Sequence, residues 1–285
     1  MKKNKRTLII SSIILLFICA LLYKALIIEN ERITVRREII STNKLDKNFD
    51  GFTIALISDL HFDNDFNKDN LHKIITKVNN INPDVLIFGG DLLKYHDANV
   101  LSDENQKLII EALSNLKAKY GKYAIYGDQD LIKNTQTKEL VNAILNQADF
   151  HILTNNRNKI YKNNSYINII GINPDDGKTL DIKTIYNKIT TKEFNLTITH
   201  FPDIIDYLPK GLNDLILAAH SHGGYISLPF TKGLIKTEGA NKYVSGKYYI
   251  DNTIIDISNG LGNDGYPVRF NTPKEILVYK IQVKK

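Results

Sequence analysis

The sequence predicts an α/β fold in which two packed mixed β-sheets are flanked by helices, a four-layer αββα sandwich, preceded by an N-terminal transmembrane helix. Between residues 53 and 127, short apolar runs alternate with amphipathic stretches, which is typical of a βαβαβ opening. After residue 150, apolar runs of strand length predominate. Because strands that are apolar on both faces need cover on both sides, two packed sheets with helices outside are the economical arrangement.

Each element is expected where its periodicity is clearest. Apolar runs predict strands at 53–58, 84–90, 123–127, 151–154, 166–171, 196–199, 215–219, 248–258 and 275–283. Amphipathic patterns predict helices at 68–80, 103–119 and 181–190. Residues 51–285 are therefore expected to form the body, and the largely polar residues 29–50 are predicted to be a stalk.

The first 28 residues have the pattern of a membrane anchor. Lys2 to Arg6 are mostly basic, and an uncharged run follows from Thr7 to Tyr23 and continues after Lys24 as Ala25 to Ile28. The seventeen residues of the first run reach about 25 Å in a helix, slightly less than a hydrocarbon core, but Lys24 can snorkel and the second run extends the span. A cleaved signal peptide is the alternative, although no small-x-small cleavage site follows the apolar run.

Charge and cysteine content narrow the function. The net charge is +6, but residues 1–38 contain eight lysines or arginines and three glutamates, which leaves the remaining chain nearly neutral. No basic field is left to attract a polyanion, so nucleic acid is not an expected partner.

The charges before the apolar run favour a cytoplasmic N-terminus, with a single-pass anchor in the cell membrane and an extracytoplasmic catalytic domain. The only cysteine, Cys19, lies in the apolar run, so any metal in the body must take nitrogen and oxygen ligands.

Carboxylates follow three consecutive predicted strands. Asp59, Asp91 and Asp128 each come at the C-terminal end of a strand, and that edge of an α/β sheet is where ligands bind. A single aspartate there is more often a turn former or a helix cap. Three in succession favour a common site.

Imidazoles follow two later strands and accompany the first carboxylate. His200 ends one strand, and His220 and His222 end the next. Alternate residues of an extended segment point the same way, so His220 and His222 can face one cluster, and Asp59 and His61 have the same spacing. Carboxylates together with imidazoles suit Zn, Fe or Mn. The other histidines, His72, His96 and His151, have no comparable partners and are expected to be ordinary polar residues.

The ordered set of motifs resembles the calcineurin-like metallophosphoesterase family. The chain has DLH at 59–61, GGD at 89–91, GDQD at 127–130, HFPD at 200–203 and HSHGG at 220–224. The family pattern is D-x-H, G-D, G-N-H-D/E, H and G-H-x-H. The segments FDGFTIALISDLH and GLGNDGYPVRFNTPKEI are similar to the membrane-anchored or exported bacterial branch of that family.

The resemblance implies a site for two divalent metal ions and a role for each motif. Such a pair can hold a hydroxide for in-line attack on phosphorus while neutralising charge on the phosphoryl oxygens. The implied ligands are Asp59, His61 and His222 for one metal, Asp128, His200 and His220 for the other, and Asp91 as the bridge between them. Asp91 and Gln129 are the predicted catalytic residues.

Two residues depart from the family pattern, and both lie in one loop. Asp128 and Gln129 stand where the family has asparagine and histidine. Two divalent metals, two aspartates and one hydroxide sum to a charge of about +1, whereas a third aspartate makes the sum zero, so the site should attract an anionic phosphate less. Gln129 can donate a hydrogen bond but cannot transfer a proton. We therefore expect a preference for phosphodiesters or anhydrides with good leaving groups, or slow turnover.

The function that follows is a two-metal phosphohydrolase, tethered to the membrane, which hydrolyses a phosphodiester, a phosphomonoester or a pyrophosphate. Its expected partners are the membrane and a phosphorylated small-molecule or lipid substrate. A surface protein that binds metal and phosphate but has lost turnover is the alternative, because of the substitutions at Asp128 and Gln129.

Overall fold

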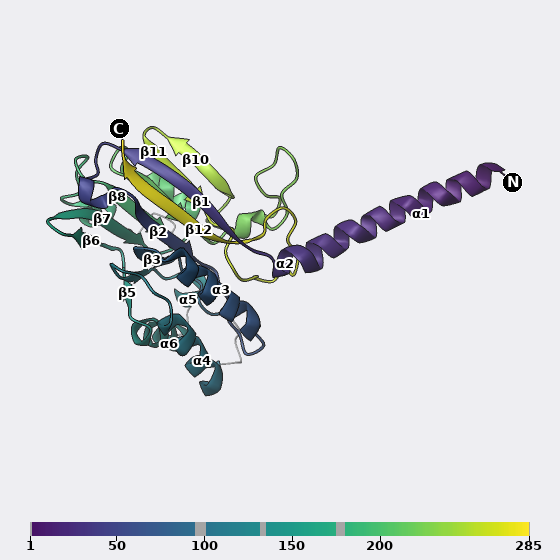
Figure 1. Ribbon diagram of the computed structural model, residues 1–285, viewed down its shortest axis with the longest axis horizontal. Coiled ribbons are helices and arrows are strands. Elements are labelled where there is room, and N and C mark those ends of the chain that lie inside the picture. The colour runs from purple at the N-terminus through teal and green to yellow at the C-terminus, as the bar shows by residue number, and fades with distance from the viewer. Residues whose placement is uncertain (1, 95–100, 132–134, 175–179, 285) are drawn as a thin grey trace.

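The predicted two-sheet architecture is confirmed by a computed structural model, which describes residues 2–94, 101–131, 135–174 and 180–284. Two six-stranded mixed sheets pack against each other, with helices on their outer faces. A long helix projects from one side of this body, and the C-terminus lies on the opposite side (Figure 1).

The first sheet has the strand order β1-β12-β2-β3-β4-β5. Four consecutive strands of this sheet run parallel to one another: β2 (Phe52–Ile57), β3 (Val85–Phe88), β4 (Lys122–Ala124) and β5 (Phe150–Ile152). β12 (Lys274–Val283) runs antiparallel to β2. The connecting helices cover the outer face of this sheet: α3 (Lys68–Ile81), α4 (Asp103–Ser114) and α6 (Thr135–Gln147).

Helix α3 shows how the sequence determines these elements. Asn67 caps its start by accepting a hydrogen bond from the Asn70 N–H, and Asn82 ends it in the left-handed conformation. The buried residues of α3 have helical spacing, so they form one stripe against the sheet: Leu71, Ile74, Ile75 and Val78.

The second sheet has the strand order β10-β11-β9-β8-β7-β6. Its parallel strands are β7 (Ser165–Ile172), β8 (Asn195–Thr199), β9 (Leu215–Ala218) and β11 (Thr253–Ile257). The antiparallel edges are β6 (Asn156–Lys162) and β10 (Gly246–Ile250). Two short helices cover its outer face, α7 (Ile182–Tyr186) and a 3₁₀ helix (Pro202–Tyr207).

The core between the sheets is aliphatic and aromatic. Leu56 and Ile87 from the first sheet belong to one buried cluster with Leu196 and Leu217 from the second. Separate buried clusters fill the space under the helices on the two outer faces. The strand ends that carry the predicted site are therefore held by a core on both sides of each sheet.

The prediction that residues 29–50 form a stalk is wrong in part. The N-terminal helix α1 (Lys2–Tyr23) continues through a π-helical turn (Lys24–Ile28) and α2 (Glu29–Glu31) into β1 (Ile33–Thr42). β1 pairs in parallel with all ten residues of β12. Residues 29–50 thus include an edge strand of the first sheet and a 3₁₀ turn (Lys47–Phe49), whose Phe49 is fully buried.

Other expected boundaries also change. The single strand predicted at 248–258 is the hairpin β10–β11, because Asp251 takes a positive φ and turns the chain before Thr253. The helix predicted at 103–119 ends at Ser114, since Asn79 of α3 accepts a hydrogen bond from the Lys117 N–H. The helix predicted at 181–190 is the shorter α7. Strand β6 and helix α6 were not predicted.

Candidate metal centre

The seven predicted ligands meet where strand ends of both sheets converge. Four come from the first sheet and three from the second, so the site lies across the junction of the two sheets. They are Asp59 and His61 after β2, Asp91 after β3, Asp128 at the start of α5 (Asp128–Leu131), His200 after β8, and His220 and His222 after β9.

These side chains form two groups, each with donor atoms within 4.8 Å of one another. The first group, called here the Asp128 group, contains Asp91, Asp128, His200 and His220. The second, the Asp59 group, contains Asp59, His61 and His222. The division is the one that the family resemblance implies for two metals.

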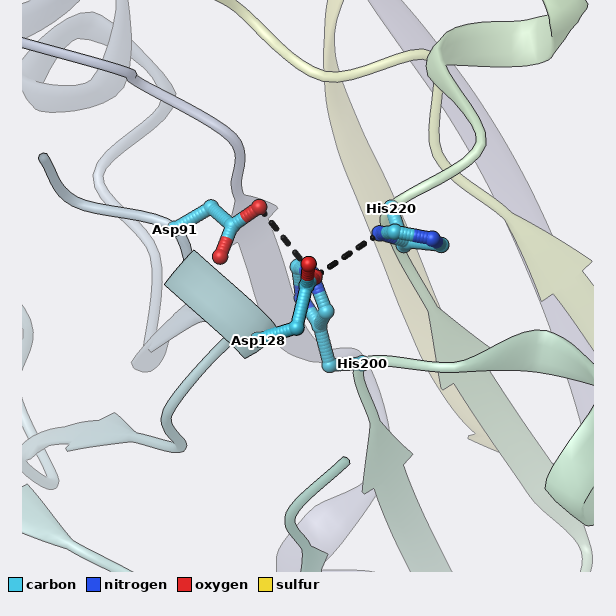
Figure 2. A group of neighbouring side chains, drawn as sticks. All are labelled: Asp91, Asp128, His200 and His220. Carbon is cyan, nitrogen blue, oxygen red and sulfur yellow. Dashed lines mark hydrogen bonds and ion pairs between the residues drawn. The ribbon is translucent and has the colours of Figure 1, made fainter. Parts of the chain in front are cut away.

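In the Asp128 group, four side chains from four strand ends point toward one another (Figure 2). Asp128 Oδ1 lies 3.0 Å from His200 Nε2 and 3.0 Å from His220 Nδ1. His200 Nε2 also lies 3.3 Å from Asp91 Oδ2. Asp128, the residue that departs from the family pattern, thus occupies the position expected of a ligand.

In the Asp59 group, two imidazoles face each other. Nε2 of His61 lies 3.1 Å from Nε2 of His222. Asp59 Oδ1 accepts a hydrogen bond from the His220 N–H, whereas Asp59 Oδ2 is buried and has no partner. Paired imidazole nitrogens beside an unpartnered carboxylate oxygen are a donor set that fits a divalent cation.

Asp91 lies between the two groups. Its Oδ2 is 3.3 Å from His200 Nε2 in one group and 3.7 Å from His61 Nε2 in the other. Its Oδ1 accepts a hydrogen bond of 3.0 Å from the Gln129 N–H, which fixes the orientation of the carboxylate. This is the placement that a bridging ligand requires.

The tautomers of two imidazoles are set by backbone carbonyls. His200 Nδ1 donates to the Gly89 carbonyl at 2.7 Å, and His220 Nε2 donates to the Glu238 carbonyl at 2.8 Å. Because a carbonyl can only accept, these bonds fix a proton on His200 Nδ1 and on His220 Nε2, and the other nitrogen of each ring, which faces Asp128, is the one that can bind a cation. Such hydrogen bonds orient histidine ligands and raise their basicity.

The backbone at the site is strained. Five of the seven predicted ligands have a positive φ, between 47° and 70°: Asp59, His61, Asp91, His220 and His222. Such conformations cost on the order of 1–3 kcal/mol each in a residue with a side chain, and they persist where the surroundings determine them. The residue before Asp128 must be glycine for a steric reason: a Cβ on Gly127 would lie 2.0 Å from Asp91 Oδ1.

Burial and mutual charge shift the ionisation of the cluster. Burial raises the pKa of Asp59 and that of Asp91 to about 6, and it lowers the pKa of His61 to about 3. Burial also opposes protonation of His200, but the carboxylates of Asp91 and Asp128 outweigh it and raise its pKa well above the usual value. The cluster therefore requires positive charge beside its carboxylates, which a divalent cation can supply.

A family model described as calcineurin-like phosphoesterase matches residues 52–246. The chain belongs to the calcineurin-like phosphoesterase family. The family is one of metal-dependent phosphohydrolases, so the predicted enzyme class is confirmed.

Curated relatives span most of this phosphoesterase. The uncharacterized metallophosphoesterase YkuE of Bacillus subtilis (strain 168) is 27% identical over 90% of this chain and 87% of that protein. An uncharacterized metallophosphoesterase of Aquifex aeolicus (strain VF5) is 25% identical over 94% of this chain and 99% of that protein. The UDP-2,3-diacylglucosamine pyrophosphatase LpxG of Chlamydia muridarum (strain MoPn / Nigg) is 26% identical, covering 81% of this chain and 83% of that protein.

Two supporting residues of this phosphoesterase were not predicted. The buried carboxylate of Asp130 accepts hydrogen bonds from the N–H groups of Gly127, Asp91 and Leu92, at 2.8 to 2.9 Å. It therefore ties the Asp91 turn to the Asp128 loop. The GDQD motif contained this residue, but only the contact between the two loops shows its purpose.

The second unpredicted residue is Arg269, which is fully buried beside the Asp59 group. Its Nη2 lies 3.2 Å from His222 Nδ1 and donates to the Gly262 carbonyl at 2.6 Å. Its remaining bonds go to Asn263 Oδ1 and to the carbonyls of Asn259 and Thr272. Burial lowers the pKa of Arg269 to about 10. No periodicity marks a buried arginine in a loop, so only a motif could have identified it.

Gln129, the other predicted catalytic residue, is buried at the start of α5. Its backbone positions Asp91, while the predicted role of its side chain stays a prediction. Among the histidines set aside, His72 lies on α3 and His151 on β5, away from both groups, and His96 lies outside the described residues.

Proposed function

We propose that this chain is a two-metal phosphohydrolase anchored in the cell membrane, with its catalytic domain outside the cytoplasm, that cleaves phosphodiester or pyrophosphate bonds. The observation that carries the proposal is the placement of Asp91 between two groups of donors. A carboxylate shared by two clusters of imidazoles and carboxylates fits a pair of cations rather than a single one.

The proposed ligands divide between the two ions as the geometry groups them. Asp59, His61 and His222 would hold one cation, and Asp128, His200 and His220 the other. Asp91 would contact both. Bound divalent cations of this kind activate water and neutralise charge on phosphoryl oxygens. Nitrogen and oxygen donors suit Mn, Fe or Zn.

The protein supplies orientation. The carbonyls of Gly89 and Glu238 fix the rings of His200 and His220, and the Gln129 N–H fixes Asp91. The Gln129 side chain can donate a hydrogen bond to a leaving group but cannot protonate it. Substrates whose leaving group departs without protonation are therefore favoured.

The proposed location and substrate class have separate support. The helix Lys5–Glu31 is long and apolar enough to cross a membrane, by its length and composition. The relative LpxG is a pyrophosphatase of a UDP-linked diacylglucosamine by its name, which supports a lipid-linked phosphate as substrate. Nothing in the near-neutral body favours nucleic acid.

The test is metal analysis of the full chain together with hydrolysis of a chromogenic phosphodiester. We expect about two equivalents of transition metal, and a rate that Asp91→Ala abolishes. Asp63→Ala, which alters a half-buried carboxylate near the site but outside both groups, is the matched control and should keep the rate. Metal-loaded protein with no rate above that of Asp91→Ala would show instead a binding protein, the alternative that Asp128 and Gln129 favour.

A further inference from the structure

We propose that the loop of residues 226–238, called here the tip loop, rests its apolar end on the lipid bilayer beside the anchor helix, so that the metal centre opens at the level of the lipid headgroups. This inference rests on the membrane anchor in the proposed function. It specifies the substrate class as phosphates presented at a membrane surface.

The end of the tip loop is unusually apolar for an exposed segment. Leu228, Phe230 and Leu234 are all exposed, and Phe230 fully so. Among the described residues after α2, the only other exposed large side chain of this kind, aliphatic or phenylalanine, is Ile39. A cluster of such residues on one loop indicates a surface that contacts an apolar partner.

The turn at the tip is preformed, and it holds a phenylalanine where glycine is favoured. The Thr231 N–H donates to the Leu228 carbonyl at 3.0 Å, and the Leu228 N–H donates to Thr231 Oγ1 at 2.9 Å. Pro229 is second in this turn, and Phe230 is third with a φ of 69°. In a turn of this type, proline occupies the second position and the residue at the third position has a positive φ. Glycine is favoured at that third position, because any other residue is strained there. The chain keeps a strained and exposed aromatic ring at this point, which implies that the ring itself is used.

The tip loop is bonded to the segment that meets the anchor helix. The Ser227 N–H donates to the Phe270 carbonyl at 2.8 Å, and Asn271 Nδ2 donates to the Ser227 carbonyl at 3.0 Å. On the helix side, Lys24 Nζ donates to Asn271 Oδ1 at 2.9 Å, and the Arg269 N–H donates to the Ala25 carbonyl at 3.0 Å. The light green loops accordingly lie beside α2 in Figure 1.

The length of the helix sets the depth of these contacts. Residues 7–28 span about 33 Å at the helical rise, close to the roughly 30 Å of a hydrocarbon core. Lys24 and Ala25 therefore lie near the boundary of the core, and the segment bonded to them lies among the headgroups. A loop that starts from that segment and exposes an apolar end has the bilayer as its nearest apolar phase. Lys232 and Lys236, also exposed on the loop, suit anionic headgroups.

Both ends of the tip loop join the metal centre. The loop begins four residues after His222, and its returning segment is bonded to the turn after His222 through the Ile235 N–H and the Gly224 carbonyl, at 3.1 Å. At its other end, the Glu238 carbonyl holds His220 Nε2. A bilayer contact at the tip therefore positions a ligand of each group relative to the headgroups, where the phosphate of an embedded lipid lies.

The test uses the absence of tryptophan from the chain, which makes any introduced tryptophan a unique reporter. Phe230→Trp is placed in the full-length protein and reconstituted into bilayers whose lipids carry bromine on the upper acyl chain. We expect loss of most of its fluorescence relative to unbrominated bilayers. Phe17→Trp, within the helix, is the positive control. Tyr161→Trp, exposed on the edge strand β6, is the matched negative control.

The outcomes separate this inference from the anchor. Quenching at position 17 together with no more quenching at position 230 than at position 161 would overturn the tip contact and leave the anchor standing. No quenching at position 17 would overturn the anchor, and the tip contact would then stand only if position 230 were quenched. A tryptophan at 230 that is shielded from aqueous acrylamide but not quenched by brominated lipid would reveal a protein partner or a second copy, and would also overturn the proposal. Phe230→Gly, which relieves the strained turn, checks that the fold does not need the ring: its unfolding temperature should equal or exceed that of the unmodified chain.

Discussion

Asp128 and Gln129 are the residues at which the chemistry of this chain can be altered most directly. Asp128 adds a negative charge between His200 and His220, and Gln129 replaces a residue that could transfer a proton. Changing Asp128→Asn and Gln129→His together should raise turnover of an alkyl phosphate by about 10²- to 10⁴-fold, the usual contribution of general acid catalysis. Hydrolysis of a phosphodiester with a nitrophenol leaving group should change much less.

Single variants and a surface control separate the contributions of positions 128 and 129 to this increase in turnover. Asp128→Asn alone should mainly lower KM for an anionic substrate, and Gln129→His alone should mainly raise kcat. Gln282→His on β12, away from the site, should do neither. If the double variant turns over an alkyl phosphate no faster than the unmodified chain, the proton-donor explanation is wrong.

Arg269 supports the Asp59 group through bonds that lysine cannot reproduce. Its guanidinium reaches three backbone carbonyls, one side-chain oxygen and the His222 ring from a fully buried position. A lysine has fewer donors and a different geometry, and each buried acceptor left without a donor costs about 1–3 kcal/mol. Arg269→Lys should therefore lower Tm and the metal content. Arg157→Lys, which also alters bonds to backbone carbonyls but near α7, should leave metal content unchanged. Equal metal loss in the two variants would contradict the role of Arg269.

Lys274 gives the stability of the protein a pH dependence away from the ligands. Burial lowers the pKa of Lys274 from 10.5 to about 8, so the folded state binds fewer protons than the unfolded chain between these two values. Stability should consequently rise with pH from 8 to 10.5, by at most on the order of 3 kcal/mol. Lys274→Met should remove this rise and stabilise the protein at pH 7. The exposed Lys280→Met is the control on the same strand. If the stability of Lys274→Met rose with pH as much as that of the unmodified chain, another titrating group would be the cause.

At the scale of elements, one arginine joins β1 to two other strands. Arg36 bonds both oxygens of Asp256 on β11, at 2.8 and 2.9 Å, and both oxygens of Glu275 on β12, at 3.0 Å each. Removing one member of a buried ion network leaves carboxylates unpaired, at a cost of about 3–5 kcal/mol. Arg36→Met should lower the free energy of unfolding by this amount, measured by denaturant unfolding in detergent. Arg37→Met, exposed on the same strand, should cost little. Similar losses in the two variants would exclude the network as the cause.

Local patterns predicted the elements that carry the site better than those at the margins. The strands before Asp59, Asp91, His200 and His220 are short, largely apolar runs that are almost entirely buried, because they are central in their sheets. Strand β1 is different: it lies at an edge, exposes the alternate residues Arg37, Ile39 and Ser41, and pairs with β12 some 240 residues away. Nothing in the periodicity of β1 indicates that β12 is the strand with which it pairs. The hairpin β10–β11 was misread as one strand because its turn occupies only two residues, of which Asp251 is the first.

At the scale of the whole molecule, the metal centre joins the two sheets. Asp59, His61, Asp91 and Asp128 follow strands of the first sheet, and the remaining three ligands follow strands of the second. Removing the metals with a chelator should lower Tm, since a ligand present at 100 times its Kd stabilises the folded state by about 2.7 kcal/mol. Restoring Mn, Fe or Zn should reverse the change. Asp91→Ala is the comparison, because it removes the ligand that both groups share and its Tm should respond less to the chelator. A Tm that the chelator leaves unchanged in the unmodified protein would contradict a structural role for the metals.

The residues that form the site could be predicted from the sequence, whereas the hydrogen bonds that orient them could not. Residue types at strand ends, together with motif order, indicated every member of both groups. The bonds that orient them come from the carbonyls of Gly89 and Glu238 and from Asp130 and Arg269, which lie in loops without periodicity. Backbone carbonyls have no sequence signature, since every residue has one. Such contacts become visible only when the two sheets are placed together.

The edge strand β1 also determines how the protein responds to mechanical force and to proteolysis. Because it follows the N-terminal helix directly and pairs in parallel with β12 over ten residues, tension on the helix would load that row of hydrogen bonds in shear, where they share the force. A protease that cut between β1 and β2 would break the covalent link to the N-terminal helix, but the helix would stay attached to the domain because β1 would stay in the sheet. Separation of the domain from the helix would require a cut before Ile33, where Arg32 alone lies between α2 and β1.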